Sequence, residues 1–309
     1  MNEKTNLIVV LGPTASGKTE FAAQLADKLK TEVISADSRQ VYRGMDLGTG
    51  KDYEDYFVEG RKVHVHLIDV VDAGYKYNVY EYQRDFLKVF SELSGERKIP
   101  VLCGGTGMYI EAVLKGYRLI EVPDDSVLRK KIENWSLQDL IEKLKSYKNL
   151  HNKTDITQRK RLIRAIEIEE YYQKHTGEDV IYPNIQPFII GIEIGRQARR
   201  ERISQRLKRR LDTGMIEEVR SLLEKNVPSD TLIYYGLEYK YITMHLLGQI
   251  YYDEMFSKLE TAIHRFAKRQ MTWFRGMERR GFEILWLDAL LDLEEKIRIV
   301  KEKLSIPFK

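Results

Sequence analysis

The chain has 309 residues, of which 43% are hydrophobic and 32% are charged, and its formal net charge is +4. This composition is typical of a globular protein and excludes an intrinsically disordered chain, because enough apolar residues are present to bury a core. No run of about twenty apolar residues occurs, so we expect no membrane-spanning helix and no membrane partner. The single cysteine, Cys103, excludes an intrachain disulfide and a cysteine-based zinc site, and fits a protein of the reducing cytoplasm.

The N-terminal segment predicts a strand, a phosphate-binding loop and a helix. The apolar run Leu7–Leu11 leads directly into Gly12-Pro13-Thr14-Ala15-Ser16-Gly17-Lys18-Thr19, and a helical pattern continues through Leu29. In such a loop, backbone N–H groups and the helix N-terminus surround phosphate oxygens, Lys18 adds a positive charge, and the Thr19 hydroxyl can ligate Mg²⁺. The sequence therefore predicts binding of a compound with a pyrophosphate group, and a nucleoside triphosphate such as ATP is the most common ligand of this loop.

Short apolar strands alternate with helical patterns after the loop, which predicts an α/β fold. We expect strands at residues 32–35, 63–70 and 99–103, and the last of these leads into Gly104-Gly105-Thr106-Gly107 and a helix at 108–114. This pattern indicates a parallel sheet that helices cover on both faces and that binds its ligand at the carboxyl ends of the strands.

The character of the chain changes between residues 118 and 186, where the sequence is polar, charged and helical in pattern, with no evident strand. A strand pattern returns at 188–194. We therefore expect a P-loop core formed by residues 1–117 and 187–309, with a helical insertion at 118–186. Apolar residues then recur at three- and four-residue spacing from Ile203 to Leu222 and from Leu259 to Trp273, which predicts two amphipathic helices.

Basic residues are concentrated in two C-terminal segments. One extends from Arg196 to Arg210, where the only acid is Glu201, and the other extends from Arg265 to Arg280. A local excess of positive charge is typical of a polyanion-binding surface, although a solvated helix face gives the same pattern. Four basic residues on one stripe of the second segment favour contact with phosphates, and they are Arg265, Lys268, Arg269 and Arg275.

Two aspartates are candidates for chemistry at the strand ends. Asp69 is equally consistent with a metal-shell carboxylate and with a turn residue. Asp37 follows the strand at 32–35; it is consistent with a helix N-cap and with a base that takes a proton from a nucleophile beside the pyrophosphate. Enzymes that transfer phosphoryl groups place an Asp at the end of a second apolar strand, whereas the strand at 99–103 ends in Gly104-Gly105-Thr106. Phosphoryl transfer is therefore not the favoured reaction.

Five segments of the chain, taken together, resemble the tRNA dimethylallyltransferase family. They are GPTASGKT at 12–19, DSRQVYRGMDLGT at 37–49, HLID at 66–69, GGTGMY at 104–109 and KRQMTWFR at 268–275. The resemblance implies transfer of a dimethylallyl group from dimethylallyl diphosphate to N6 of the adenosine on the 3′ side of the anticodon, position 37, in tRNAs that read codons beginning with U. Diphosphate is the other product, Mg²⁺ is the expected cofactor, and the expected partner is the anticodon stem-loop of tRNA, bound by a monomer of the chain.

The same resemblance assigns roles to individual residues. The loop from Gly12 to Thr19 would hold the prenyl donor in place of ATP, with Thr19 at the metal. Asp37 would accept a proton or hydrogen bond from the adenine amine, Thr106 would lie beside the reacting centre, and Arg220 would contact the pyrophosphate. The residues expected to contact tRNA are Asp37, Ser38, Arg39, Gln40, Thr106, Arg129, Lys160, Arg161, Leu162, Ile163, Arg164, Arg265, Lys268, Arg269 and Arg275.

One segment departs from the family pattern, which usually reads Gly-Tyr-Arg-Gln. Here it reads Gly236-Leu237-Glu238-Tyr239-Lys240, so a carboxylate replaces a cation at a place expected near tRNA. Three alternatives stay open: an adenylate isopentenyltransferase with the same donor site, a small-molecule P-loop kinase, and a non-catalytic RNA-binding protein. The last would explain the basic segments but not the combination of the loop, Asp37 and Thr106.

Overall fold

A computed structural model describes residues 5–147, 158–175 and 182–304 of the chain. These residues fall into two compact units, a larger one from Met1–Tyr117 and Asn184–Lys309 and a smaller one from Arg118–Pro183. The smaller unit ends at Pro183, three residues before the end of the insertion predicted at 118–186. The reason is that Asn184 and Gln186 already pair with the start of the sheet: Asn6 Nδ2 donates to Asn184 O at 2.8 Å, and Asn6 N donates to Gln186 O at 3.1 Å.

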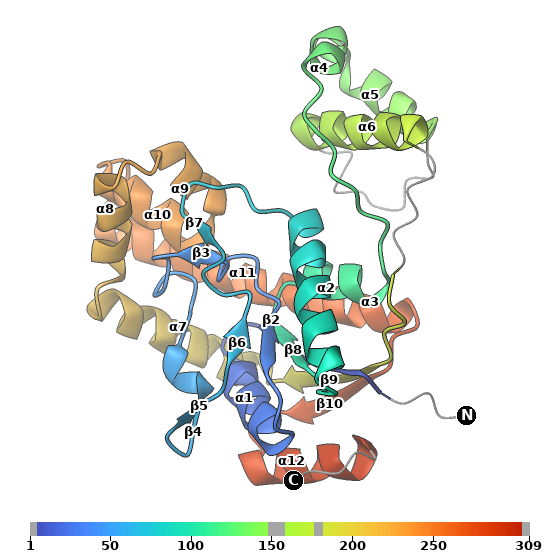
Figure 1. Ribbon diagram of the computed structural model, residues 1–309. Coiled ribbons are helices and arrows are strands. Elements are labelled where there is room, and N and C mark those ends of the chain that lie inside the picture. Colours follow the sequence, from blue (N-terminus) through green and yellow to red (C-terminus); the bar gives the residue numbers. More distant parts are fainter. Residues whose placement is uncertain (1–4, 148–157, 176–181, 305–309) are drawn as a thin grey trace. The chain divides into compact units, whose positions relative to one another are not determined.

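A six-stranded sheet with the order β10-β9-β1-β8-β2-β6 forms the centre of the larger unit (Figure 1). Every strand pair in this sheet is parallel, which confirms the predicted α/β fold. β1 is buried along its whole length, as expected for a strand that is covered on both faces. The six strands are β1 (Leu7–Leu11), β2 (Val33–Ser35), β6 (Val65–His66), β8 (Val101–Gly104), β9 (Pro187–Glu193) and β10 (Ile284–Asp288).

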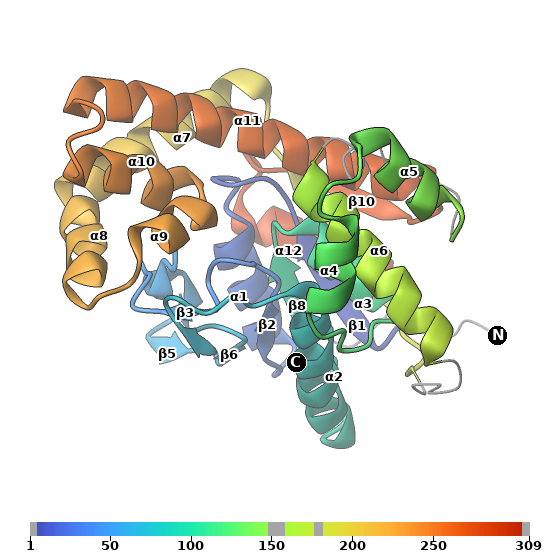
Figure 2. The same cartoon turned by 90° about the horizontal axis from the view of Figure 1, so that it is seen from above.

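Helices of the larger unit cover both faces of this sheet. Successive residues of β1 point to opposite faces, so Val9 belongs to the core cluster that includes Phe86 and Phe274, whereas Val10 belongs to the cluster that includes Phe21 and Val300. α11, at 28 residues, runs beside α7 (Figure 2). The helices are α1 (Lys18–Lys28), α2 (Val79–Gly95), α3 (Gly107–Leu114), α7 (Arg196–Asp212), α8 (Met215–Glu224), α9 (Ser229–Tyr235), α10 (Leu237–Leu246), α11 (Tyr252–Arg279) and α12 (Leu293–Leu304).

Two predicted elements differ from the structure. The amphipathic pattern from Ile203 to Leu222 is divided between α7 and α8 at Gly214, whose φ of +104° no helix accommodates. The strand predicted at 63–70 is wrong beyond β6, because Leu67 and Asp69 have positive φ angles of 61° and 56°.

Several short elements lie between β2 and α2, before and after this irregular segment. β3 (Tyr42–Arg43) pairs with β7 (Val71–Asp72) in a separate two-stranded sheet. A one-turn helix, η1 (Tyr53–Tyr56), precedes a hairpin of β4 (Phe57–Val58) and β5 (Arg61–Lys62).

The smaller unit contains three helices and no strand among its described residues, in line with the helical character predicted for this segment. They are α4 (Ser126–Ile132), α5 (Leu137–Lys145) and α6 (Arg159–Lys174). Their apolar faces enclose a core of Leu128, Ile132, Leu140, Leu144, Leu162 and Ile166. No helix in the described parts of either unit has the length and hydropathy that would let it cross a bilayer.

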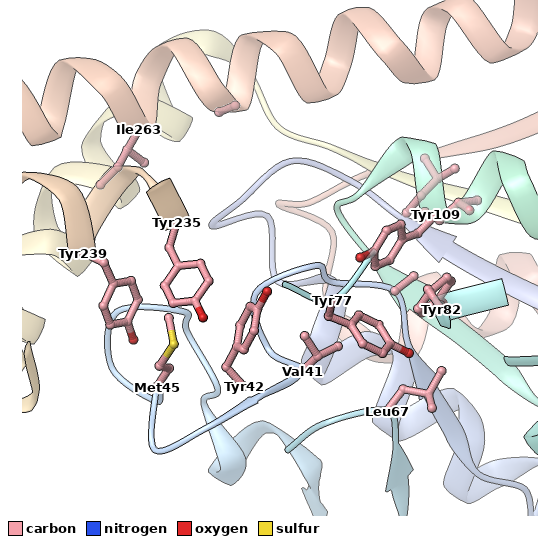
Figure 3. Close-up of a cluster of buried hydrophobic side chains, with 14 of the residues drawn as sticks. Val41, Tyr42, Met45, Leu67, Tyr77, Tyr82, Tyr109, Tyr235, Tyr239 and Ile263 are labelled. Atoms are coloured by element: carbon pink, nitrogen blue, oxygen red, sulfur yellow. The ribbon is translucent and has the colours of Figure 1, made fainter. Parts of the chain in front are cut away.

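A group of buried tyrosines packs the segment that follows β2 against α2, α3, α9 and α10 (Figure 3). The rings of Tyr42 and Tyr235 lie 4.5 Å apart, and those of Tyr82 and Tyr109 stack at 4.1 Å. The hydroxyls also find partners, since Tyr82 donates to Ser35 O at 3.1 Å and Tyr235 donates to the backbone oxygen of Tyr75 at 2.9 Å. Aromatic packing and these hydrogen bonds together define the path of the chain around Asp37.

The buried side chain of Lys51 connects three parts of the segment between β2 and α2 through hydrogen bonds. Its side chain is fully buried, and Nζ donates to Tyr42 O at 2.6 Å, to Asp46 Oδ1 at 2.9 Å and to Asp69 Oδ1 at 2.5 Å. The Tyr53 hydroxyl donates to the second carboxylate oxygen of Asp69 at 2.6 Å. Asp69 is therefore a turn residue with a structural role, which settles the choice that its sequence position left open.

Replacing Lys51 by Met tests this anchor. The change leaves the carboxylates of Asp46 and Asp69 without the cation that they share. Breaking a fully buried ion pair costs about 3–5 kcal/mol of folding stability. Because both aspartates are partly exposed, we expect the free energy of unfolding to fall by about 2 kcal/mol. Urea denaturation measures the free energy of unfolding, with Lys62→Met, an exposed lysine on β5, as the matched control. Equal stability of the two variants would contradict the role of Lys51.

Candidate functional site

Three neighbouring strands bring predicted site residues to one edge of the sheet. β1 ends before the phosphate-binding loop, β8 ends before Gly105 and Thr106, and β2 ends before Asp37, with β8 lying between the other two strands. A cavity of about 350 Å³ opens at this edge, where parallel sheets generally bind their ligands. The predicted site residues that line it are Thr14, Lys18, Thr19, Asp37, Ser38, Arg39, Gln40 and Arg269.

The loop has the local geometry of a phosphate cradle. Gly17 has a φ of +81° and directly precedes α1, so the helix N-terminus follows the turn without a side-chain cap. Lys18 is partly buried beside the loop, with Nζ 3.5 Å from Pro13 O, and loss of contact with water lowers the pKa of its amine. Burial also raises the pKa of the neighbouring Cys103 thiol to about 12, which makes it a neutral wall of the cavity and not a nucleophile.

Asp37 and Thr106 lie close together through backbone hydrogen bonds. The Thr106 hydroxyl accepts from Ser38 N at 3.0 Å, and Thr106 N donates to Ala36 O at 3.1 Å. Asp37 Oδ1 accepts from Arg39 N at 2.8 Å within a turn, so Asp37 does not cap a helix. Its Oδ2 has no hydrogen-bond partner among the described residues and belongs to a side chain that lines the cavity. Thr106 itself supports this turn and is not among the lining residues.

Gln270 of α11 joins the phosphate-binding loop to the turn after β8. Its side chain is 6% exposed; Oε1 accepts from Thr14 N at 2.9 Å and Nε2 donates to Gly105 O at 3.0 Å. The fit of this turn requires glycine, because a Cβ at Gly104 would lie 2.2 Å from Ala36 O. The glycines of GGTG and the glutamine of KRQMTWFR therefore belong to a single packing arrangement.

Two arginines of α7, Arg206 and Arg210, also line the cavity, whereas the sequence analysis placed them only in a basic segment and not at the phosphate-binding loop. Arg206 Nη1 donates to Thr14 Oγ1 at 3.2 Å, and Arg206 and Arg210 both pair with Asp52, at 2.6 and 2.9 Å. Burial raises the pKa of Asp52, but the two arginines hold it below its usual value. The signal that identifies them is their four-residue spacing beside Ile203 and Leu207, which places both on the inward face of the helix.

Arg220, expected at the pyrophosphate, lies elsewhere. It is exposed on α8 and is not among the residues that line the cavity. Glu218, two positions earlier, faces inward and accepts hydrogen bonds from the backbone N–H groups of Asp46, Leu47 and Gly48 at 2.6–3.0 Å. Residues two apart on a helix do not share a face, so α8 cannot present both side chains to the same site. The arginines that line the cavity beside the phosphate-binding loop are Arg206 and Arg210.

The residues predicted to contact tRNA in the larger unit are in two places. Ser38, Arg39 and Gln40 line the cavity, although the Gln40 amide is already bonded to Gly50 O at 3.0 Å. The basic stripe of α11 is exposed at Arg265, Lys268, Arg269 and Arg275. Two of these arginines line an open groove together with lysines of α10 and α11; the four residues are Arg265, Arg269, Lys240 and Lys258. Arg275 pairs with Glu193 at 2.9 Å.

The smaller unit corrects several predicted contacts. Leu162 is fully buried and Ile163 packs against the same core, so neither has a side chain placed to bind RNA. Arg129 of α4 pairs with the buried carboxylate of Glu167 on α6 at 2.6 Å and so connects these two helices, whereas Arg164 pairs with the same carboxylate within α6 at 3.1 Å. Two of the predicted residues, Lys160 and Arg161, are exposed on α6 and available to a polyanion.

Glu238 lines the cavity beside Arg206 and Arg210. Burial raises the pKa of its carboxyl group, while the two arginines act in the opposite direction. Asp55, on η1, has a pKa raised to about 6 by burial and by the charge of Asp52. The wall of the cavity thus places the cations Arg206 and Arg210 beside a carboxyl group, Glu238, whose charge burial disfavours, and Asp55 lies outside the lining residues.

Residues 40–277 match the protein family described as "IPP transferase". The chain is 62% identical to tRNA dimethylallyltransferase 2 of Bacteroides fragilis, with 97% of this chain and 98% of that protein covered. It is 50% identical to tRNA dimethylallyltransferase 1 of Geotalea daltonii, with 98% of both covered.

Solved structures give the same assignment. The tRNA isopentenylpyrophosphate transferase of Bacillus halodurans superposes with a TM-score of 0.71 at 30% identity, covering 98% of this chain and 96% of that one. A eukaryotic dimethylallyltransferase acting on tRNA shares the fold, with a TM-score of 0.77 at 20% identity, covering 99% of this chain and 81% of that one. Sequence matches over nearly the whole length and a shared fold lead to one conclusion: this chain belongs to the IPP transferase family, together with the tRNA dimethylallyltransferases.

Proposed function

We propose that this chain transfers the dimethylallyl group of dimethylallyl diphosphate to N6 of adenosine 37 in tRNAs that read codons beginning with U, and releases diphosphate. The observation that carries the proposal is the placement of Asp37, with a free carboxylate oxygen, in the same cavity as Lys18 and Thr19 of the phosphate-binding loop. We further propose that it acts as a monomer in the cytoplasm, where its tRNA partner is found.

In the proposed reaction, a bond forms between adenine N6 and the first carbon of the prenyl group as the bond from that carbon to the diphosphate oxygen breaks. Negative charge develops on the diphosphate, where the loop N–H groups, Lys18 and Arg206 stabilise it. The N6 proton passes to Asp37, whose Oδ2 is the free acceptor. The adenine must leave its stack to enter the cavity, at a cost that is lower in a single-stranded anticodon loop than in a duplex.

The residues at the loop fit a magnesium ion, because the Thr19 hydroxyl and the Asp37 carboxylate line one cavity and oxygen atoms are the ligands that Mg²⁺ prefers. We propose that Thr19, together with the diphosphate oxygens, holds this ion. When bound, it would neutralise part of the charge on the leaving group.

Phosphoryl transfer, the kinase alternative, has less support. The strand next to β1 ends in glycines and Thr106, and the carboxylate of Asp69 is engaged by Lys51 and Tyr53. Transfer to free AMP, the other enzymatic alternative, would make no use of the basic groove lined by Arg265 and Arg269, which suits a polynucleotide.

Asp37→Asn tests the acceptor role of the carboxylate. The amide keeps an oxygen for Arg39 N but is a poor base, so we expect kcat to fall by about 100-fold or more while donor binding is retained. Labelled dimethylallyl diphosphate with Mg²⁺ and total tRNA measures transfer, and equilibrium dialysis measures donor binding. Asp72→Asn, on β7, is the control. Label that appears in AMP but not in tRNA would refute the acceptor assignment.

Arg206→Met tests which arginine meets the diphosphate. Loss of one charged hydrogen-bond donor is expected to weaken donor binding by about tenfold. Arg220→Met is the matched variant, and it should bind the donor as the unmodified chain does because its side chain is outside the cavity. If Arg220→Met weakened donor binding and Arg206→Met did not, the contact between Arg220 and the pyrophosphate that the resemblance implies would be supported instead.

The double variant Lys268→Ala, Arg269→Ala tests the basic stripe of α11. Removing a side chain that neutralises one phosphate should reduce the slope of log K against log salt by about one, so we expect weaker tRNA binding and a flatter salt dependence. Filter binding at several salt concentrations measures both. The control removes Lys301 and Lys303, which are exposed on α12; identical slopes for the two double variants would remove α11 from the tRNA surface.

A further inference from the structure

Two histidines and a glutamate gather at the end of the sheet away from the cavity. Glu32 precedes β2 directly, His64 precedes the edge strand β6 directly, and His66 is the last residue of β6. Val33 N donates to His64 O at 3.0 Å, so the two strands begin side by side. Asp37 follows the carboxyl end of β2, whereas this group lies at its amino end. It is therefore separate from the proposed diphosphate site.

The three side chains have the spacing of a chelating group. One possible ligand atom from each residue lies within 4.8 Å of the other two. His66 Nε2 is 2.7 Å from Glu32 Oε2, and the two imidazole rings are 4.4 Å apart, edge to face. Residues two apart in a strand project to the same side, which is why His-Val-His presents two imidazoles together and why the adjacent strand can supply the carboxylate.

Two imidazoles and one carboxylate form a donor set typical of Zn²⁺ and related divalent transition ions. Ligand distances of about 2.0–2.2 Å to such an ion require that His66 and Glu32 exchange their mutual hydrogen bond for the metal. They also require that side-chain rotation brings the three ligand atoms, which now lie within 4.8 Å of one another, to tetrahedral spacing. His64 is exposed, which leaves one side of the group open to water. The arrangement is a three-ligand site with room for a solvent ligand.

The positive charge of Lys98 opposes the binding of a metal cation to this group. Its Nζ donates to Glu32 Oε1 at 2.6 Å, so it occupies the carboxylate oxygen that does not face His66. It also lies 2.7 Å from Glu96 Oε2, a second partner that can retain the lysine. Lys98 therefore reduces the affinity of the group for a cation without occupying any of the three ligand atoms.

We propose that Glu32, His64 and His66 form a binding site for a divalent transition-metal ion, with Zn²⁺ as the best match. β2 and β6 share a register of only two residue pairs, Val33 with Val65 and Ile34 with His66. A metal bound by side chains of both strands adds a cross-link at this sheet edge. Because an ion that binds the folded chain alone stabilises it, metal binding raises the melting temperature.

The experiment uses the untagged, chelator-treated full chain. Isothermal titration with ZnCl₂, and with CoCl₂ followed by visible absorbance, is expected to show one saturable site, and the melting temperature should rise with Zn²⁺ and return on addition of EDTA. His64→Ala, His66→Ala and Glu32→Gln should each lose this binding and the thermal shift. His175→Ala, at the end of α6, is the matched control and should keep both.

Lys98→Met separates a metal site from a simple ion-pair cluster. Removal of the competing cation leaves all three ligands in place, so the variant should bind Zn²⁺ more tightly than the unmodified chain. Circular dichroism and prenyl transfer to tRNA show whether each variant is folded. The proposal is overturned if the folded, unmodified chain shows no saturable binding, or if binding persists in both histidine variants.

Discussion

The pair of hydrogen bonds made by Gln270 is the constraint on which the site depends. One end of the amide holds Thr14 N of the phosphate-binding loop, and the other holds Gly105 O beside Thr106. Thr106 in turn binds Ser38 N, next to Asp37. A single buried side chain of α11 thus relates the phosphate-binding loop to the turn that carries Asp37. A buried amide left without these partners would be costly, so the helix and both loops must be ordered together.

Electrostatics give the cavity its second constraint. Lys18, Arg206 and Arg210 bring positive charge into a partly enclosed space, and Asp52 compensates the two arginines. Burial lowers the pKa of Lys18, so an anion placed beside this lysine stabilises its charged form. The same α11 that carries Gln270 on its buried side exposes Lys268 and Arg269 on the other, which couples the donor site to the surface proposed for tRNA.

The sequence predicted the parts of the fold that short-range patterns encode. The apolar run of β1, the phosphate-binding loop and the start of α1 are contiguous, and the observed strand is the one expected. The strand predicted at 63–70 was wrong beyond His66, because hydrophobicity alone does not show that Leu67 and Asp69 adopt left-handed backbone conformations. Nor does it show that the side chain of Lys51, from another turn of the chain, binds Asp69. Leu162 was expected at the tRNA surface because the family resemblance assigns the whole run 160–164 to tRNA, whereas the periodicity of α6 turns its side chain into the core.

By itself, the sequence determined the parallel α/β class, the phosphate-binding loop and the candidate carboxylate Asp37, since each depends on residues that are adjacent in the chain. Only the tertiary structure decided which arginines meet the loop. Arg206 is 192 positions from Thr14 along the chain, yet it donates to its hydroxyl, and Arg220 lies on the exposed face of the next helix. The physical reason is that helix phase and helix packing, and not charge, determine which cations of a basic segment are buried beside the cavity.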